Sequence, residues 1–206
     1  MKPIAYISTD IQFTRLNDID RENGLVFLQL YDIPFADFSA YAGVIITNFV
    51  EEAFLLEHKS IIENYLNDGG VVLSQTENFL PWLPGCGNWM RSPISLKDRE
   101  IRLTEPVHPM FTGIDPYDLN YKKGVRGFFS RGYLEAPEHS EVIVEDQEGK
   151  AIIYIDRKTT GGTIVAGAGT DLYRFGIREN SSRVLRQQIL NWIRQEDEAN
   201  KGETKQ

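Results

Sequence analysis

The most constraining feature of this chain is a strand–helix–glycine turn–strand pattern in its first half. Residues 41–48 are mostly apolar and rich in β-branched side chains, which is typical of a strand buried on both faces of a parallel sheet. The apolar residues of 51–66 recur with the spacing of one helix face. Gly69-Gly70 then stops the helix, and a short apolar segment, 71–74, follows. This order predicts a right-handed βαβ unit.

Other segments predict strands on both sides of this unit. The apolar segments 4–8 and 25–31 predict two more strands in the amino-terminal half. Segments 151–156 and 163–167 each follow a glycine-containing turn, which is typical of hairpin strands. Further candidate strands are 100–104, 125–129 and 141–145. We therefore expect an α/β fold with a mixed, mostly parallel sheet, antiparallel additions in the second half, and helices on both faces.

Length and composition indicate a single domain. The chain has 206 residues, of which 41% are hydrophobic and 25% charged, so it is long enough to bury one sizeable core. We expect one α/β domain over residues 1–196, closed by a helix over 181–196 that begins at a serine cap. The charged segment 197–206 is expected to be a disordered tail.

Charge and cysteine content narrow the range of partners and compartments. The formal net charge of −8 disfavours nucleic acid as a partner, because an acidic surface repels phosphates. The single cysteine, Cys86, excludes an internal disulfide and fits a reducing compartment. No apolar segment has the length of a membrane span or of a signal sequence. We therefore expect a cytoplasmic protein with no membrane partner.

Polar side chains follow several of the predicted strands. In an open α/β sheet, ligands bind at the carboxyl ends of the strands, where such side chains meet. We expect six of them to line one rim and bind a small polar molecule such as a sugar: Asp10, Asn48, Gln75, Glu77, Thr170 and Asp171. The alternative is that these are ordinary turn and cap residues. The sequence predicts no dedicated metal site and identifies no cofactor.

The residues that a hydrolase would need are missing from the turn after segment 71–74. That turn consists of 74–77, with neither a cysteine nor the serine of a G-x-S-x-G motif. Cys86, in a glycine-flanked loop, is either a displaced nucleophile with His108 or His58 as its base or, as is more common for a lone cysteine, a small buried residue. The three histidines form no zinc-hydrolase motif; they are His58, His108 and His139.

Two further segments allow a functional and a structural interpretation. The loop 77–93 carries Phe79, Trp82 and Trp89, which either dock a partner or simply cover the end of the sheet. Basic residues at 122, 123, 126 and 131 form either a local patch or a solvated face. Arg174 and Arg178, downstream of a glycine-containing turn, make anion binding an additional option.

Three glycine-containing segments occur in an order that resembles a known superfamily. They are Gly69-Gly70 before Val71-Val72-Leu73, the His-Pro loop 107–114, and the glycine-flanked strand 161–171. Together they resemble the class I glutamine amidotransferase-like superfamily, and in particular its ThuA-like branch. The resemblance implies a flavodoxin-like, three-layer sandwich.

The resemblance also implies which activity is missing. Catalytic members of the superfamily carry a cysteine after the central strand and a histidine after the last one. The corresponding positions here are 74–77 and Thr170-Asp171, which contain neither residue type. The resemblance therefore implies the scaffold without glutaminase chemistry. ThuA-like relatives are often tied to sugar metabolism, which favours a carbohydrate ligand.

Three functional hypotheses follow from these patterns. The leading one is a non-amidotransferase member of the superfamily that binds a small polar molecule or a protein partner at the strand ends. The alternative is a carbohydrate-active hydrolase or isomerase that uses Glu77 and Asp171 as acid and base. The third is an interaction subunit that docks through its aromatic loop. The sequence leaves a homo-oligomer open.

Overall fold

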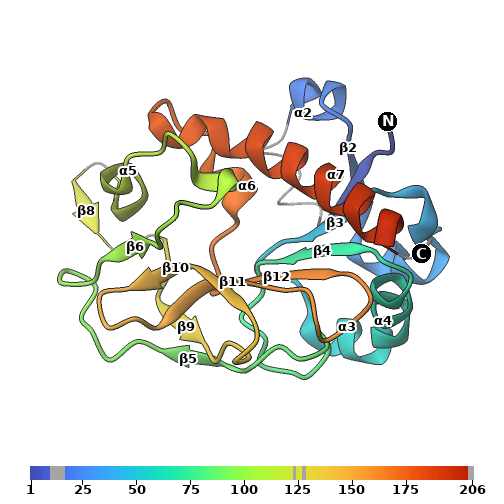
Figure 1. Ribbon diagram of the computed structural model, residues 1–206, viewed down its shortest axis with the longest axis horizontal. Helices are drawn as coiled ribbons and strands as arrows, with labels where there is room; N and C mark the ends of the chain where they lie inside the picture. Colours follow the sequence, from blue (N-terminus) through green and yellow to red (C-terminus); the bar gives the residue numbers. More distant parts are fainter. Residues whose placement is uncertain (10–16, 123, 127–128, 204–206) are drawn as a thin grey trace.

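The computed structural model describes residues 1–9, 17–122, 124–126 and 129–203 (Figure 1). Its main sheet has eight strands in the order β2-β1-β3-β4-β12-β11-β10-β6. Their bounds are β1 Ile4–Ser8, β2 Leu25–Gln29, β3 Gly43–Ile46, β4 Val71–Ser74, β6 Ile101–Leu103, β10 Glu141–Asp146, β11 Ala151–Asp156 and β12 Thr163–Gly167. Strands β2, β1, β3, β4 and β12 are parallel, whereas β11, β10 and β6 are antiparallel additions. The predicted mixed sheet is therefore confirmed.

Helices cover both faces of the sheet and complete a three-layer α/β sandwich. The long helix α7, Leu185–Glu203, crosses one face, and α3, Glu52–Glu57, and α4, Lys59–Asn67, lie on the other (Figure 1). A Cβ atom on Gly43 would lie 2.2 Å from Ile193 Cγ2, so only glycine allows α7 to approach β3 this closely. The core consists of these inner faces and buries every residue of β1, β3, β4 and β12.

Shorter elements complete the molecule around this sandwich. The remaining helices are α2 Asp18–Glu22, α5 Pro116–Asn120 and α6 Leu172–Phe175, with 3-10 helices η1 Leu30–Phe35, η2 Phe38–Ala40, η3 Pro109–Phe111 and η4 Ser181–Val184. Two small sheets pair β5 Trp89–Arg91 with β9 Gly132–Leu134, and β7 Tyr121–Lys122 with β8 Val125–Arg126. The loop predicted over 77–93 thus contains a short strand, β5.

Several predicted boundaries are wrong for identifiable reasons. The helix expected over 51–66 is divided at His58, whose φ of −105° and ψ of 17° depart from helical geometry. The strand expected over 25–31 ends at Gln29, because Leu30 starts a 3-10 helix that contains Pro34. Of the strand expected over 125–129, only β8 forms within the described residues.

The expected disordered tail is instead the end of α7, which continues to Glu203. Asn200 holds this end against the sheet, since its Nδ2 donates to Gly69 O at 3.1 Å and to Thr163 Oγ1 at 3.2 Å. Residues 204–206 lie outside the described residues. At the other end, the serine cap is also wrong, because Asn180 caps η4 by accepting from Ser182 N.

Candidate functional site

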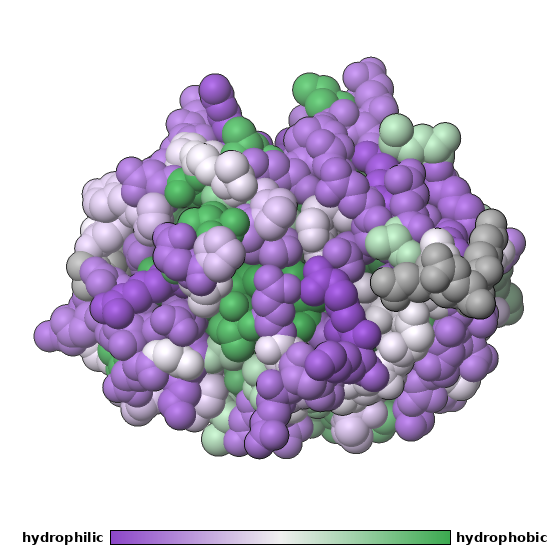
Figure 2. Space-filling view, in the orientation of Figure 1, coloured by the Kyte–Doolittle hydropathy of each residue, from purple (hydrophilic) through white to green (hydrophobic). Residues whose placement is uncertain are grey.

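A cavity of about 660 Å³ lies at the carboxyl ends of β3, β4 and β12. We call it the strand-end cavity. Its lining comes from the turns after these three strands, from segment 130–131 before β9, and from α6 and the residues that follow it. The carboxyl ends of parallel strands are where α/β folds bind ligands. The face seen in Figure 2 is largely hydrophilic, with hydrophobic residues grouped near its middle.

The structure brings four of the six predicted site residues together in the strand-end cavity. They are Asn48 after β3, Glu77 after β4, and Thr170 and Asp171 after β12. Gln75 is not among its lining residues: its buried side chain donates to Ser74 O and accepts from Leu172 N, so it supports the start of α6. Asp10 lies outside the described residues.

Asp171 has a structural role in the wall of the cavity. One carboxylate oxygen accepts from Arg174 N at 3.0 Å and thereby caps α6. The other accepts from the buried Tyr6 hydroxyl on β1 and lies 4.0 Å from Arg174 Nε. Burial raises the pKa of Asp171 against the opposing effect of these partners. Both oxygens are thus already bonded within the chain.

Asn48 and Thr170 tie the loops of the cavity together. Asn48 Nδ2 donates to Gly169 O at 3.0 Å, which links the end of β3 to the turn after β12. Thr170 Oγ1 donates to Phe129 O and so links the same turn to the segment before β9. Gly169 adopts a φ of 101°, a conformation that favours glycine. The cavity wall on this side is therefore held by side-chain hydrogen bonds between distant segments.

Glu77 differs from Asp171 in that its carboxylate is uncommitted. Within the described part of the chain, it accepts no hydrogen bond and forms no ion pair. It is half-buried and also lines an adjoining cavity of about 260 Å³. That cavity includes Glu52, whose Oε2 accepts from Leu80 N at 2.9 Å and whose pKa is raised, chiefly by burial. Glu77 is the acidic side chain best placed to contact a ligand.

Cys86 has the surroundings of a structural thiol. Asn78 Nδ2 and the Tyr154 hydroxyl donate to its sulfur at 2.9 Å and 3.1 Å. Burial raises the pKa of the thiol to about 12, so it stays protonated at neutral pH. A catalytic cysteine needs the opposite shift, because the thiolate is the nucleophile.

The histidines occupy three separate structural positions. His108 caps η3 by accepting from Met110 N, packs on Trp192, and has a pKa lowered chiefly by burial. His139 Nε2 lies 3.0 Å from Asp156 Oδ1 beyond the far end of β11. His58 joins α3 to α4. None of the three lines the strand-end cavity.

The aromatic side chains of loop 77–93 mostly cover the sheet. Trp82 is completely buried, and Trp89 is half-buried with its ring 5.7 Å from that of Phe79. Only Phe79 is largely exposed. Phe49, which was not predicted from the sequence, also lines the cavity; its side chain is 80% exposed and its φ is 63°. The sequence around Phe49 gives no signal that could have identified it, because an aromatic residue after a strand is also common in an ordinary turn.

The strand-end cavity also gathers basic side chains that are distant in sequence. They are Lys122, Arg131, Arg174 and Arg178. In the sequence these residues belong to two separate groups, one around 122–131 and one at 174 and 178. Only the fold shows that β7, the segment before β9, and α6 converge on one cavity.

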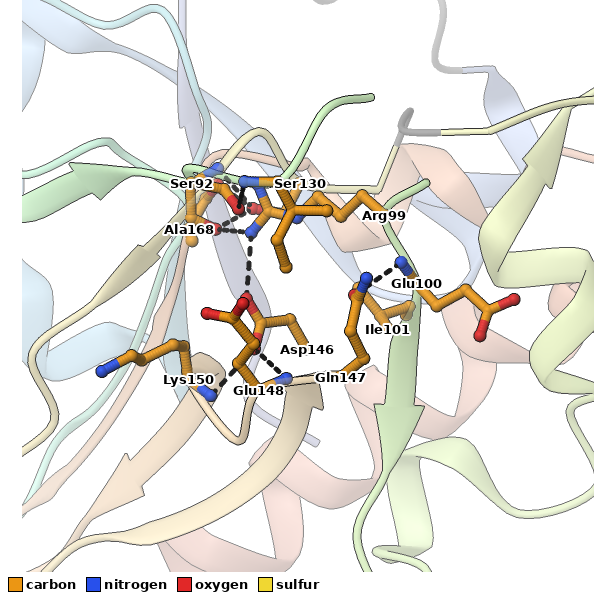
Figure 3. Close-up of polar contacts among 12 residues, drawn as sticks. Ser92, Arg99, Glu100, Ile101, Ser130, Asp146, Gln147, Glu148, Lys150 and Ala168 are labelled. Carbon is orange, nitrogen blue, oxygen red and sulfur yellow. Dashed lines mark hydrogen bonds and ion pairs between the residues drawn. The ribbon is translucent and has the colours of Figure 1, made fainter. Parts of the chain in front are cut away.

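A buried ion pair lies next to residues that line the cavity (Figure 3). Arg99 Nη2 lies 3.8 Å from Asp146 Oδ2 and donates to Gly132 O at 2.7 Å. Ser130 Oγ donates to Gly132 O at 2.6 Å and to Ala168 O at 3.0 Å. Since Ser130 and Ala168 line the cavity, Arg99 helps to fix this part of its wall through Gly132.

The described residues contain neither a metal-binding cluster nor a membrane-spanning helix. Within residues 1–9, 17–122, 124–126 and 129–203, no three His, Cys, Asp or Glu side chains are grouped so that they could hold a metal ion. Over the same residues, no helix has the length and apolar character needed to cross a bilayer.

Comparison with known proteins supports the fold assignment. No protein-family model and no curated protein matches the chain. Among solved structures, it is similar to a glutamine amidotransferase from Thermotoga maritima, with a TM-score of 0.52 and 13% sequence identity. The similarity covers 97% of this chain and 93% of that one. At this identity the similarity shows the fold alone, and it agrees with the flavodoxin-like, three-layer α/β sandwich that the resemblance implies.

Proposed function

We propose that this protein binds a small polar molecule in the strand-end cavity and does not hydrolyse glutamine. One observation carries the proposal: side chains from the turns after β3, β4 and β12 line a single cavity of about 660 Å³. Such a volume is ordinary for small-molecule sites. Because this is also the edge where α/β folds bind ligands, the position and the size of the cavity support the same conclusion.

The chemistry of the cavity argues against an amidotransferase. Neither residues 74–77 after β4 nor Thr170-Asp171 after β12 include a cysteine or a histidine. The one cysteine of the chain, Cys86, has a raised pKa. The protein thus has the scaffold of a glutamine amidotransferase-like fold without a thiol nucleophile in this cavity.

We further propose a hydroxylated ligand, such as a sugar, and a place in the ThuA-like branch. The uncommitted carboxylate of Glu77 can accept hydrogen bonds from hydroxyl groups. The exposed ring of Phe49 offers an apolar surface for a sugar face. The acid–base alternative has one point in its favour, the raised pKa of Asp171, but both oxygens of that carboxylate are bonded to Tyr6 and to the backbone of α6. Binding is therefore the better supported function.

A thermal-shift screen of sugars, sugar derivatives, nucleotides and divalent ions tests this proposal. A binder present at 100 times its Kd should stabilise the fold by about 2.7 kcal/mol. Glu77→Gln should weaken the affinity for a hydroxylated binder about tenfold, since it replaces charge-assisted hydrogen bonds with neutral ones. Glu57→Gln, at an exposed position of α3 outside the cavity, is the matched control. A silent screen, or a binder to which both variants respond equally, would contradict the proposal.

A further inference from the structure

We infer that the molecule bound in the strand-end cavity carries an anionic group, a carboxylate or a phosphate, in addition to its hydroxyl groups. This inference rests on the proposed function, because it specifies the ligand of the same cavity. The inference comes from the charges that line the cavity, from the hydrogen bonds that Arg131 and Arg178 make or lack, and from the apolar residues beside them.

The cavity concentrates positive charge in an acidic protein. The chain has a formal net charge of −8, yet among the described residues four cationic side chains line this cavity against two carboxylates. One of those carboxylates, Asp171, is already bonded to Tyr6 and to Arg174 N. The cavity therefore attracts anions although the protein as a whole repels them.

Arg131 offers an unoccupied guanidinium group at the cavity. Its side chain is exposed and, within the described residues, makes no hydrogen bond or ion pair. Its backbone is nevertheless fixed: Arg131 O accepts from Ser92 N at 3.2 Å, and the neighbouring Ser130 and Gly132 are bonded to Ala168 and Arg99 (Figure 3). An arginine on a fixed backbone, with no partner of its own, is suited to binding a ligand.

Arg178 is only partly satisfied by the protein. Its guanidinium lies 3.5 Å above the Phe175 ring, and Nη1 donates to Asp118 O at 3.3 Å. Within the described part, this bond uses one of its five N–H donors. Burial lowers the pKa of Arg178, and the nearby Asp118 carboxylate opposes this effect only in part. The remaining N–H donors of Arg178 can bind an anionic group of the ligand.

The residues that line the cavity fit a small organic anion. Arginine binds carboxylate and phosphate groups through paired N–H donors. Phe49, Phe175 and Ile177 also line the cavity and provide apolar contacts for the body of such a molecule. Glu77 would bind hydroxyl groups, while the arginines bind the anionic group. A sugar phosphate or a sugar acid combines these features.

Calorimetric titration of the full chain with glucose 6-phosphate, gluconate and glucose at constant ionic strength tests the inference. We expect at least one of the two anions to bind, and to bind at least about tenfold more tightly than glucose. Arg131→Gln and Arg178→Gln should each weaken that binding about tenfold. Arg183→Gln, at an exposed position of η4 outside the cavity, should leave the affinity unchanged. Circular dichroism of each variant checks that it folds.

The possible outcomes separate the inference from the proposal on which it depends. If glucose binds as tightly as both anions, or if Arg131→Gln binds the anion as well as the parent protein does, the anionic ligand is overturned and the cavity remains a binding site. If glucose 6-phosphate, gluconate and glucose all fail to bind at millimolar concentration, the anionic sugar class is overturned. The broader screen then decides whether the cavity binds any small polar molecule.

Discussion

Glu77 and Asp171 follow different strands and line the same cavity, yet their carboxylates have different surroundings. The oxygens of Asp171 accept from Tyr6 and from Arg174 N, whereas the carboxylate of Glu77 has no partner within the described residues. Residue type and position after a strand were enough to predict that both line the cavity. Their different roles depend on Tyr6, which contacts Asp171 across 165 positions of sequence.

Cys86 allows a prediction at the same scale. Since burial raises its pKa to about 12, the native thiol should react with iodoacetamide far more slowly than that of the urea-unfolded chain at about pH 8.5, where a free thiol is half ionised. Because the folded thiol has the higher pKa, its contribution to stability is fully present below the pKa of the unfolded thiol. It is lost as the pH rises from that value through the folded pKa, since the unfolded thiol ionises first. Equal alkylation rates in the native and unfolded chains would contradict this account of Cys86.

Among the elements, the parallel strands were the most predictable. β3 and β4 are short and apolar, and the helical segment between them is followed by Gly69-Gly70, so local sequence was sufficient to identify them. The end of α7 was not predictable, because Asn200 is fixed by Gly69 O and Thr163, which lie far away in sequence. A charged segment that bonds to distant groups cannot be distinguished locally from a disordered tail.

The buried ion pair between Arg99, which precedes β6, and Asp146, at the end of β10, leads to a stability prediction. Arg99 and Asp146 are each 1% exposed in their side chains, and Arg99 also bonds to Gly132 O. Arg99→Met should lower the free energy of unfolding by about 3–5 kcal/mol, because Asp146 is left buried without its counter-charge. Adding Asp146→Asn should recover part of the loss. Urea denaturation measures both effects, and a change below about 0.5 kcal/mol for Arg99→Met, the range of an ordinary surface substitution, would contradict the structural role.

For the whole molecule, the fold was predictable and the charge distribution was not. The order of apolar segments and glycine turns predicted a mixed sheet with helices on both faces, and the superfamily resemblance implied the three-layer sandwich that the structure shows. The strand-end position of Asn48 and Glu77 followed from the same topology. The gathering of Arg131 and Arg178 did not, because it depends on how the antiparallel half folds back over the ends of the parallel strands. The net charge disfavoured nucleic acid, and Arg174 and Arg178 left anion binding as an option, but only the fold places Arg131 at the same cavity.

The central claim, that the strand-end cavity is the binding site, is tested most directly by two-dimensional amide NMR during a titration with glucose 6-phosphate. The account predicts saturable shifts concentrated at Asn48, Glu77 and Gly169. A second cavity of about 400 Å³, lined by residues that include Tyr65 and Lys201, serves as the internal comparison. Saturable shifts at that second cavity, with the amides after β3, β4 and β12 unmoved, would contradict the claim.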